Sequence, residues 1–214
     1  ERLPVAVTFD DDLPSHAEHA LPAFARHGAV ATAFLCRPGV SFWWQDLQLV
    51  IDSGAVAADG LPHIAADVVE PALRRAPGAI GRLAKAIEDL APERRDEVAA
   101  ALRAASPSPP AVLDDAGVAR LAAAGWEIGA HTAGHYLLPT LGDEQLDREL
   151  ERRPLGPGDE LPATLAYPHG KATGREADAA RRAGYEAAFT GYREVLTEWT
   201  DSHLIGRLRA ELTS

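Results

Sequence analysis

The sequence has no methionine and a single cysteine, Cys36. One thiol cannot form an intrachain disulfide, so the fold does not depend on such a bond. Because Cys36 ends an apolar segment, we interpret it as a small buried residue rather than a reactive thiol. The sequence leaves localisation open between the cytoplasm and a secreted or cell-envelope location, and a signal peptide in a longer chain stays open too.

Basic residues and long apolar runs are also scarce. Lys and Arg together number 21 against 32 Asp and Glu, which gives a net charge of −11. Such a chain lacks the basic face that nucleic acid or an anionic membrane surface requires in a partner. No apolar run is long enough to cross a bilayer, so we expect no transmembrane segment. The oligomeric state is not determined by these features.

Short apolar segments alternate with amphipathic stretches along the rest of the chain. With 214 residues and 46% hydrophobic content, the chain can bury a full core, and we expect a single domain over 1–214. The alternation predicts a parallel sheet with crossover helices, an α/β fold. By itself it does not distinguish a (β/α) barrel from a doubly wound sheet. Strands are expected near 4–9, 31–35, 126–130, 163–167, 187–190 and 204–209, and helices near 16–27, 114–124, 143–153 and 174–183.

Residues 41–112 interrupt the alternation. We expect a mainly helical insertion there, because alanine- and arginine-rich periodic stretches end in a proline run at 106–110 that cannot continue a helix. The aromatic pair Trp43 and Trp44 has two interpretations, packing of the insertion or a wall for a sugar ring. Helices are predicted near 44–53, 79–90 and 93–105.

Two polar segments directly follow predicted strands. Residues 8–12 read Thr-Phe-Asp-Asp-Asp, and residues 131–135 read His-Thr-Ala-Gly-His. The carboxyl ends of parallel strands share one rim, so both segments are expected to meet there. Three adjacent carboxylates repel one another unless a cation or a proton offsets their charge.

The spacing of the two histidines points to the same chemistry. On one turn of helix, residues four apart lie on one face and can share a cation. Two imidazole nitrogens and one carboxylate oxygen form the three-ligand set of a catalytic zinc-type site, which leaves positions open for water and substrate. Each segment alone also has an ordinary interpretation, as a solvated turn or helix cap and as a pair of surface histidines.

At this point the sequence resembles the polysaccharide deacetylases that share the NodB homology domain, the family 4-like carbohydrate esterases. The three motifs occur in the family's order, and similarity extends to their flanks. The resemblance implies a distorted, incomplete (β/α) barrel of the NodB type with a helical insertion after the second strand. The matching segments are 8–11, 131–135 and 166–170 for the motifs, and 21–22, 31–35, 125–129 and 183–188 for the flanks.

The resemblance also implies roles for individual residues. Asp11, His131 and His135 are expected to hold one divalent metal ion, with zinc favoured over cobalt or nickel. Asp10 is expected to be the general base, and the backbone N–H of His169 to stabilise the oxyanion. Asp12, where much of the family has glycine, is expected to cap the following turn. The remaining residues expected to contact substrate are Tyr167, Pro168, His16, Trp43, Trp44 and His203.

Two features depart from the family pattern. Many members have an arginine that orients the base where this chain has Ala166, so the orientation of Asp10 is left unexplained. Many members also have a late Leu-x-His motif that protonates the leaving amine, but His203 does not occupy its position. His16 and His169 are the other candidate acids. We expect Asp10 to act as both base and acid, with no single histidine indispensable.

The sequence therefore predicts an enzyme, a metal-dependent carbohydrate N-deacetylase. Its expected substrate is an N-acetylated amino sugar in a polysaccharide, glycolipid or glycoconjugate. Two alternatives stay open: hydrolysis of a non-sugar amide or imide on the same scaffold, and a catalytically weak carbohydrate-binding relative.

Overall fold

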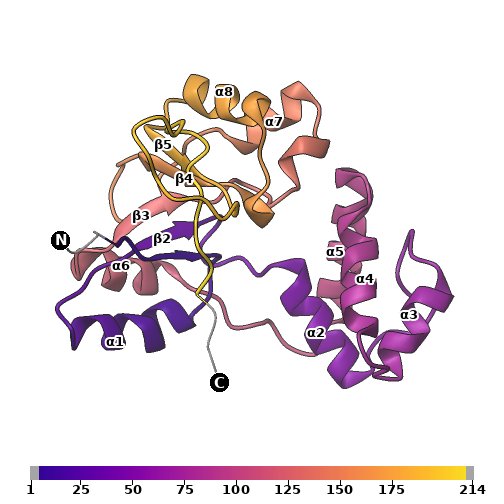
Figure 1. Ribbon diagram of the computed structural model, residues 1–214. Helices are drawn as coiled ribbons and strands as arrows, with labels where there is room; N and C mark the ends of the chain where they lie inside the picture. The colour runs from indigo at the N-terminus through magenta and orange to yellow at the C-terminus, as the bar shows by residue number, and fades with distance from the viewer. Residues whose placement is uncertain (1–4, 211–214) are drawn as a thin grey trace. The chain divides into compact units, whose positions relative to one another are not determined.

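The structure, a computed structural model, describes residues 5–210. Its chain divides into two compact units (Figure 1). One unit is built from the residues up to Gly39 together with those from Val112 onward, and the other is Val40–Ala111. Pro4, where the first predicted strand begins, lies outside the described residues.

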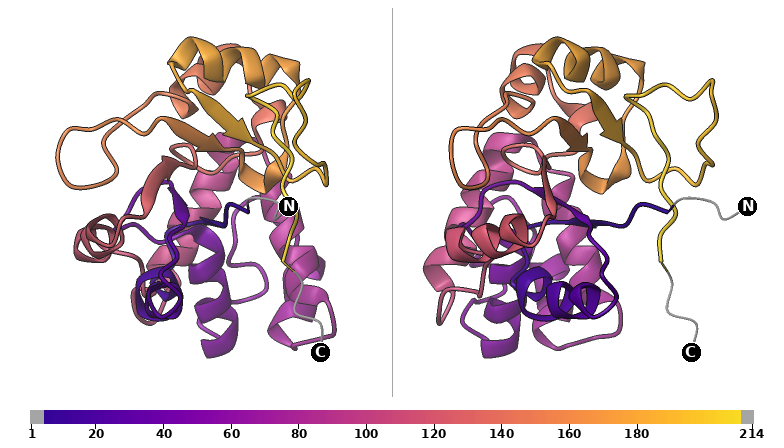
Figure 2. Two further views of the ribbon diagram at one scale, coloured as in Figure 1. Left: turned by 60° about the vertical axis from the view of Figure 1, so that its left-hand side comes forward. Right: turned by 90° about the vertical axis from the view of Figure 1, so that its left-hand side faces the viewer.

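The first unit is organised around five parallel strands in the order β1-β2-β3-β4-β5. Neighbours in sequence are neighbours in space, whereas the strand order of a doubly wound sheet reverses at a switch point. The strands curl into a half-barrel (Figure 2). This confirms the predicted α/β fold, a distorted barrel of the NodB type. The strands are β1 (Thr8–Asp10), β2 (Thr32–Leu35), β3 (Glu127–Ala130), β4 (Thr164–Ala166) and β5 (Ala187–Phe189).

The sixth predicted strand, 204–209, is reduced to one parallel bridge between Phe189 and Ile205. After Ile205 the chain forms a hydrogen bond with the loop that follows β5, in which the backbone N–H of Arg207 donates to the Tyr192 carbonyl at 3.0 Å. Gly206 permits this close approach, since a Cβ there would lie 2.6 Å from the same carbonyl oxygen.

Helices connect the strands of this unit and begin and end at clear signals. The Asp114 side chain accepts from the backbone N–H of Gly117 at the start of α6, and Thr173 and Glu176 form a capping box at the start of α8. Gly184 ends α8 in the left-handed conformation, with φ of 89°. The elements are η1 (His16–Ala20), α1 (Leu21–Ala25), α6 (Asp115–Ala123), η2 (Leu138–Thr140), α7 (Asp143–Glu149), η3 (Pro168–Gly170) and α8 (Gly174–Ala183).

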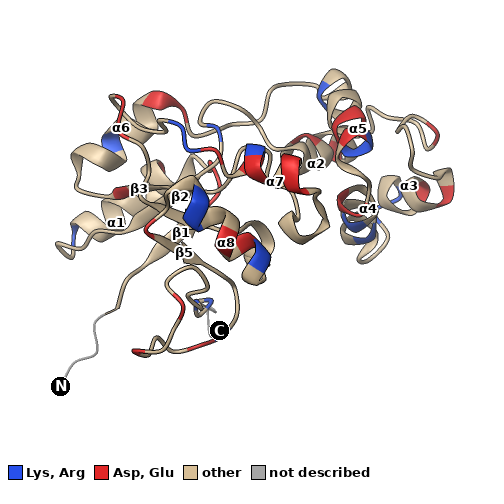
Figure 3. Cartoon of the chain, turned by 90° about the horizontal axis from the view of Figure 1, so that it is seen from above, with Lys and Arg blue, Asp and Glu red and all other residues tan. Residues whose placement is uncertain are grey.

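Apolar side chains fill the space between these helices and the sheet. Phe24 of α1 and Trp126 before β3 meet edge to face at 5.3 Å, and both pack on Phe9 of β1. On the other side, α7 and α8 carry acidic and basic residues together (Figure 3). Arg175 of α8 pairs with Asp143 of α7 at 2.7 Å. This exposed pair contributes little beyond the apolar contacts.

The second unit, Val40–Ala111, is the helical insertion after β2 that the sequence predicts. Its helices are α2 (Trp43–Ser53), α3 (Ala66–Leu73), α4 (Ala79–Glu88) and α5 (Pro92–Ala105). They surround an apolar core of their own that includes Leu47, Leu83 and Leu102, all buried. Helix α3 is not among the helices predicted from the sequence, and it contains Pro71, a residue atypical of a helix interior. Among the described residues, no helix is both long and apolar enough to cross a membrane.

Candidate metal centre and active site

The polar segments that follow β1, β3 and β4 lie at the same rim of the half-barrel. Asp10 is the last residue of β1, and Asp11 follows it. His131 follows the last residue of β3, and His169 lies in η3, which is separated from β4 by Tyr167 alone. The parallel register of the strands therefore brings residues far apart in sequence to one place.

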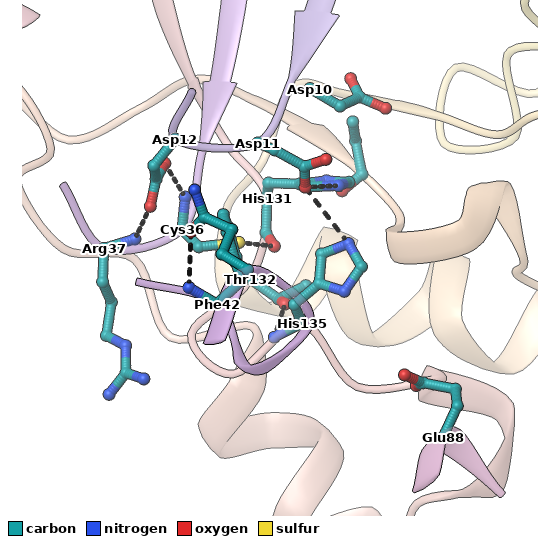
Figure 4. A network of polar contacts seen from close by, with 12 residues as sticks. Asp10, Asp11, Asp12, Cys36, Arg37, Phe42, Glu88, His131, Thr132 and His135 are labelled. Carbon is teal, nitrogen blue, oxygen red and sulfur yellow. Dashed lines mark hydrogen bonds and ion pairs between the residues drawn. The ribbon is translucent and has the colours of Figure 1, made fainter. Parts of the chain in front are cut away.

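Asp11, His131 and His135 converge there as a possible ligand set (Figure 4). Their candidate ligand atoms all lie within 4.8 Å of one another. Oδ1 of Asp11 is 3.4 Å from Nε2 of His135 and 3.7 Å from Nε2 of His131. Oδ1 is buried and has no hydrogen-bond partner. Atoms this close, yet mostly beyond hydrogen-bond length, are spaced as ligands around a shared cation, so the residues fit a divalent metal ion.

The tautomer of His131 suits this role. Its Nδ1–H donates to the backbone carbonyl of Ala166 at 2.7 Å. The lone pair of Nε2 is therefore the one directed at Asp11, and the carbonyl contact fixes the plane of the ring. Ala166 ends β4, so the neighbouring strand itself orients this ligand.

The histidine pair does not lie on a helix, contrary to the geometry inferred from its spacing. Residues 131–137 form an irregular loop. The Oγ1 of Thr132 accepts from the backbone N–H of His135 at 3.2 Å, and this closes a turn that brings the second imidazole back toward the first. The rings lie 4.9 Å apart. A four-residue spacing can thus serve a shared cation without helical backbone.

A buried carboxylate, that of Glu149 in α7, fixes this loop. Its Oε2 accepts from the backbone N–H groups of Ala133 at 3.1 Å and Gly134 at 2.6 Å. A Cβ at Gly134 would lie 2.3 Å from the Tyr136 ring, so a larger residue there would displace the Tyr136 side chain. The sequence reading did not single out Glu149, since a lone glutamate in an amphipathic helix carries no motif.

Strained backbone is concentrated at the candidate site. Within the described part of the first unit, the non-glycine residues with positive φ are Asp11 (74°), Thr132 (67°), His135 (54°) and His169 (57°). Each such residue costs on the order of 1–3 kcal/mol and persists only where its surroundings impose it. Two metal-ligand candidates and the proposed oxyanion residue are among the four. This clustering supports a functional site at the rim.

Asp10 faces an arginine from the far end of the chain. Arg207 Nη1 donates to Oδ1 at 2.7 Å, and Nη2 donates to Oδ2 at 2.7 Å. Burial acts to raise the pKa of Asp10, but the hydrogen bonds from Arg207 and the nearby charges of His131, Arg207 and His16 outweigh it and lower that pKa. Asp10 is therefore held as the carboxylate that a general base must be.

The next two carboxylates have other surroundings. Burial raises the pKa of Asp11, while His131 acts in the opposite direction. Asp12 accepts from the backbone N–H groups of Cys36 at 2.9 Å and Arg37 at 2.7 Å, and burial raises its pKa to about 6. Asp12 thus caps the end of β2 rather than the turn that follows it in sequence. Cys36 is buried, as expected, and its thiol donates to the His131 carbonyl.

Residues of the third motif are divided between the site and the core. The ring of His169 lies 4.8 Å from that of His135, so this side chain borders the metal-ligand cluster. Tyr167 is fully buried, and its hydroxyl donates to the carbonyl of His203. Pro168 is buried as well. Tyr167 therefore belongs to an apolar core cluster and Pro168 is buried, and the substrate contacts expected of both stay predictions.

The two other candidate histidines are buried and bonded to backbone. His16 directs Nε2–H at the carbonyls of Asp10 and Asp11, both at 3.0 Å. It supports the backbone of the first motif, and the substrate contact expected of it stays a prediction. His203 donates from Nε2 to the Tyr185 carbonyl at 2.9 Å and is buried, and the substrate contact expected of it stays a prediction.

The aromatic pair of the insertion is described within its own unit. Trp43 is 8% exposed and belongs to the apolar core of the insertion. Trp44 is partly buried and stacks on Phe42, with ring centroids 4.1 Å apart. Both side chains pack within the insertion, and a substrate contact by Trp43 or Trp44 stays a prediction.

Comparison with known proteins agrees with this site. The sequence model of the polysaccharide deacetylase family matches residues 104–188, which include His131, His135 and His169. The resemblance to polysaccharide deacetylases is confirmed. Neither Asp10 nor Asp11 lies in the matched residues, so the family match and the clustering with Asp11 are independent observations. No curated protein matches the chain.

Two solved deacetylase structures show the same fold. The deacetylase PplD from Streptococcus pyogenes, solved in complex with acetate, is 14% identical to this chain, with a TM-score of 0.56. The match covers 98% of this chain and 67% of PplD. The BpsB deacetylase domain from Bordetella bronchiseptica is 13% identical with a TM-score of 0.51, and 95% of this chain covers 70% of it. At these identities the likeness supports the half-barrel fold.

Proposed function

We propose that the protein is a metal-dependent hydrolase that removes an N-acetyl group from an amino sugar in a polysaccharide, glycolipid or glycoconjugate. The observation that carries the proposal is the juxtaposition of a three-residue metal-ligand cluster with an ionised carboxylate, that of Asp10, on the neighbouring residue of the same strand end. Metal-assisted hydrolysis of an amide by water uses ligands that hold the metal ion and a carboxylate that accepts a proton from the water.

In this proposal each rim residue has one task. Asp11, His131 and His135 hold a divalent cation, with zinc favoured and cobalt or nickel as alternatives. When bound, the cation supplies Lewis acidity toward water and the acetamide carbonyl. Asp10 accepts the proton of the attacking water, because its carboxylate is ionised and fixed. The backbone N–H of His169 donates to the developing oxyanion.

The proton for the leaving amine is the step that the family motifs do not explain in this chain. Both His16 and His203 commit Nε2 to backbone carbonyls, and both are buried. This supports Asp10 returning to the amine the proton that it took from water, as the sequence suggested. His169, whose ring borders His135, is the remaining imidazole at the rim.

Three considerations favour a carbohydrate substrate. The chain resembles polysaccharide deacetylases, and the similar S. pyogenes deacetylase was solved with acetate, the acid released by N-deacetylation. The acidic chain suits a neutral substrate or a cationic amine product better than an anionic polymer. The absence of an arginine at position 166 was an argument for a carbohydrate-binding protein without turnover. That argument is weakened, because Arg207 pairs with Asp10.

The direct test offers the metal-loaded protein a panel of N-acetylated oligosaccharides, with acetate release as the readout, and of small non-sugar amides and imides, with loss of the substrate as the readout. We expect acetate from N-acetyl sugars, roughly 10²–10⁴-fold slower release by the Asp10→Asn variant, and little hydrolysis of the small amides and imides. Faster turnover of an amide or imide would transfer the proposal to a non-sugar amidohydrolase. Binding of the sugars without any acetate would favour a carbohydrate-binding protein.

A further inference from the structure

The chain after β5 returns to the mouth of the half-barrel and brings Arg207 to Asp10. The bridge from Ile205 to Phe189 and the bond from the Arg207 N–H to the Tyr192 carbonyl hold this segment against the end of the sheet. Figure 1 shows it as the yellow stretch that runs from β5 past the strands. Gly206 allows the close backbone contact that sets the position of the next side chain.

Every nitrogen of the Arg207 guanidinium has a partner. Nε donates to the Thr190 carbonyl at 3.2 Å, just beyond β5. Nη1 donates to Thr8 Oγ1 at 3.0 Å and to Asp10 Oδ1 at 2.7 Å, and Nη2 donates to Asp10 Oδ2 at 2.7 Å. The guanidinium also lies over the Phe34 ring, 5.6 Å from its centroid. One side chain thus links the end of β5 to β1.

We propose that Arg207 is the positioning residue of the catalytic base Asp10, supplied from the end of the sheet because the third motif has Ala166 instead of an arginine. The inference rests on the proposed function, in which Asp10 is the base. It goes beyond the family resemblance, because Arg207 lies outside the matched residues 104–188 and comes from a different element. Ala166 contacts the site through its backbone, because its carbonyl accepts a hydrogen bond from Nδ1–H of His131.

The contact geometry explains why an arginine is required. A forked guanidinium contacts both oxygens of Asp10, which fixes the plane of the carboxylate as well as its position. Each oxygen keeps a further lone pair, so the carboxylate can still accept a proton from water. A lysine at 207 provides a single charge without the fork and cannot fix that plane.

The first test compares Arg207→Ala, Arg207→Lys and a control, Arg175→Ala, all loaded with the same metal. Arg175 also pairs with an aspartate, Asp143, but on the outer surface between α7 and α8. We expect Arg207→Ala to lower kcat roughly 100-fold, the cost typical of a misplaced catalytic group, with KM changed less than about twofold. Arg207→Lys is expected to lie in between, and the control is expected to match wild type. Metal content is expected to be equal in all four proteins.

Chemical rescue separates positioning from a general loss of folding. Added guanidinium ion at concentrations below denaturation should restore part of kcat to Arg207→Ala, since it can refill the vacated place beside Asp10. The same salt should not activate Arg207→Lys or the control. A kcat for Arg207→Ala within about threefold of wild type, or an equal loss in the control, would overturn the inference.

A spectroscopic measurement keeps the inference testable if Arg207→Ala fails to fold or no substrate is found. In ¹H–¹⁵N spectra of the metal-free and metal-loaded protein, the Nη–H signals of Arg207 should be resolved and slow to exchange. Replacement of Asp10 by alanine should collapse them, while the Arg175 signals stay unchanged. Averaged Arg207 signals in wild type would overturn the inference whatever the substrate. Absent acetate release with these signals intact would reject the proposed function instead.

Discussion

Asp10 and Asp11 are adjacent in the chain but have different partners. Arg207 and neighbouring positive charges lower the pKa of Asp10 against the effect of burial, whereas burial raises the pKa of Asp11 beside two imidazoles. Because Asp11 follows β1 with a positive φ of 74°, its side chain departs from the strand in a direction that a regular strand residue cannot reach. The difference in partners is what allows one carboxylate to bind a cation and the other to accept a proton.

This division predicts the effect of Asp10→Asn. The amide keeps the size of the carboxylate but cannot accept a proton from water, so we expect kcat to fall by roughly 10²–10⁴-fold with metal still bound. Metal content by elemental analysis and acetate release measure the two parts separately. Near-normal turnover would reject Asp10 as the base, and loss of the metal would place Asp10 among the ligands.

A second residue-scale prediction concerns the buried histidines. If Asp10 serves as both base and acid, His16→Ala and His203→Ala should each keep more than roughly a hundredth of wild-type kcat, the least that a dedicated general acid contributes. His16→Ala leaves the Asp10 and Asp11 carbonyls without a donor, so it should also lower the melting temperature. A loss of roughly a thousandfold or more in either variant, with metal bound, would identify that histidine as the missing acid.

Glu149 holds the loop that carries His135 without itself being a candidate metal ligand. Glu149→Ala leaves the N–H groups of Ala133 and Gly134 without their carboxylate acceptor, and the loop that carries His135 loses its anchor. We expect metal affinity to fall about 10–100-fold, as is typical when a group that orients a ligand is removed. Glu144→Ala on the same helix is the matched control, because its side chain is 95% exposed. Equal metal dissociation constants for the two variants, measured by calorimetry, would remove Glu149 from the account.

At the scale of elements, the loop between β3 and α7 shows what the sequence could and could not predict. The spacing of His131 and His135 correctly predicted a shared location, but the implied helix is absent. Thr132 and His135 adopt positive φ instead, which local propensity disfavours and which Glu149 and the Thr132 turn impose. The Thr132 turn is a local contact, but the contacts from Glu149 span 15 or 16 residues in sequence, so no local pattern reveals the complete geometry.

The strands and crossover helices were easier to predict, because apolar periodicity and caps are local. Helix α8 is expected over 174–183 and observed over the same residues, with its capping box and terminal glycine in place. By contrast, the partner of Asp10 was missed. Asp10 and Arg207 are 197 residues apart, and only the parallel topology and the return of the chain after β5 bring them together.

The helical insertion has its own element-scale prediction. Trp43 lies in the core of its unit, so Trp43→Ala should destabilise that unit by about 3–5 kcal/mol, measured by chemical denaturation. Trp44 is partly buried and stacks on Phe42, so Trp44→Ala should cost less stability. If Trp44 forms a wall for a sugar ring, its replacement should raise KM for the sugar with kcat nearly unchanged. Unchanged KM would leave Trp44 with a packing role only.

At the scale of the whole molecule, the half-barrel collects the functional groups at the carboxyl ends of its strands. The ligands come from the ends of β1 and β3, the base from β1, and its arginine partner from beyond β5. The second unit contributes a separate helical core. That the two units act as the single domain predicted from length stays a prediction. One cooperative unfolding transition would support it, and two separated transitions would contradict it.

The measurement that tests the central claim most directly is calorimetric titration of the metal-free protein with Zn²⁺. The account predicts one strong site in wild type, its loss in His131→Ala and His135→Ala, and its retention in the control His63→Ala. His63 is a suitable control because it lies in the second unit and its Nε2 bonds to Glu97. Acetate release should return in proportion to the occupied sites. Undiminished binding in the two site variants, or activity without bound metal, would contradict the account.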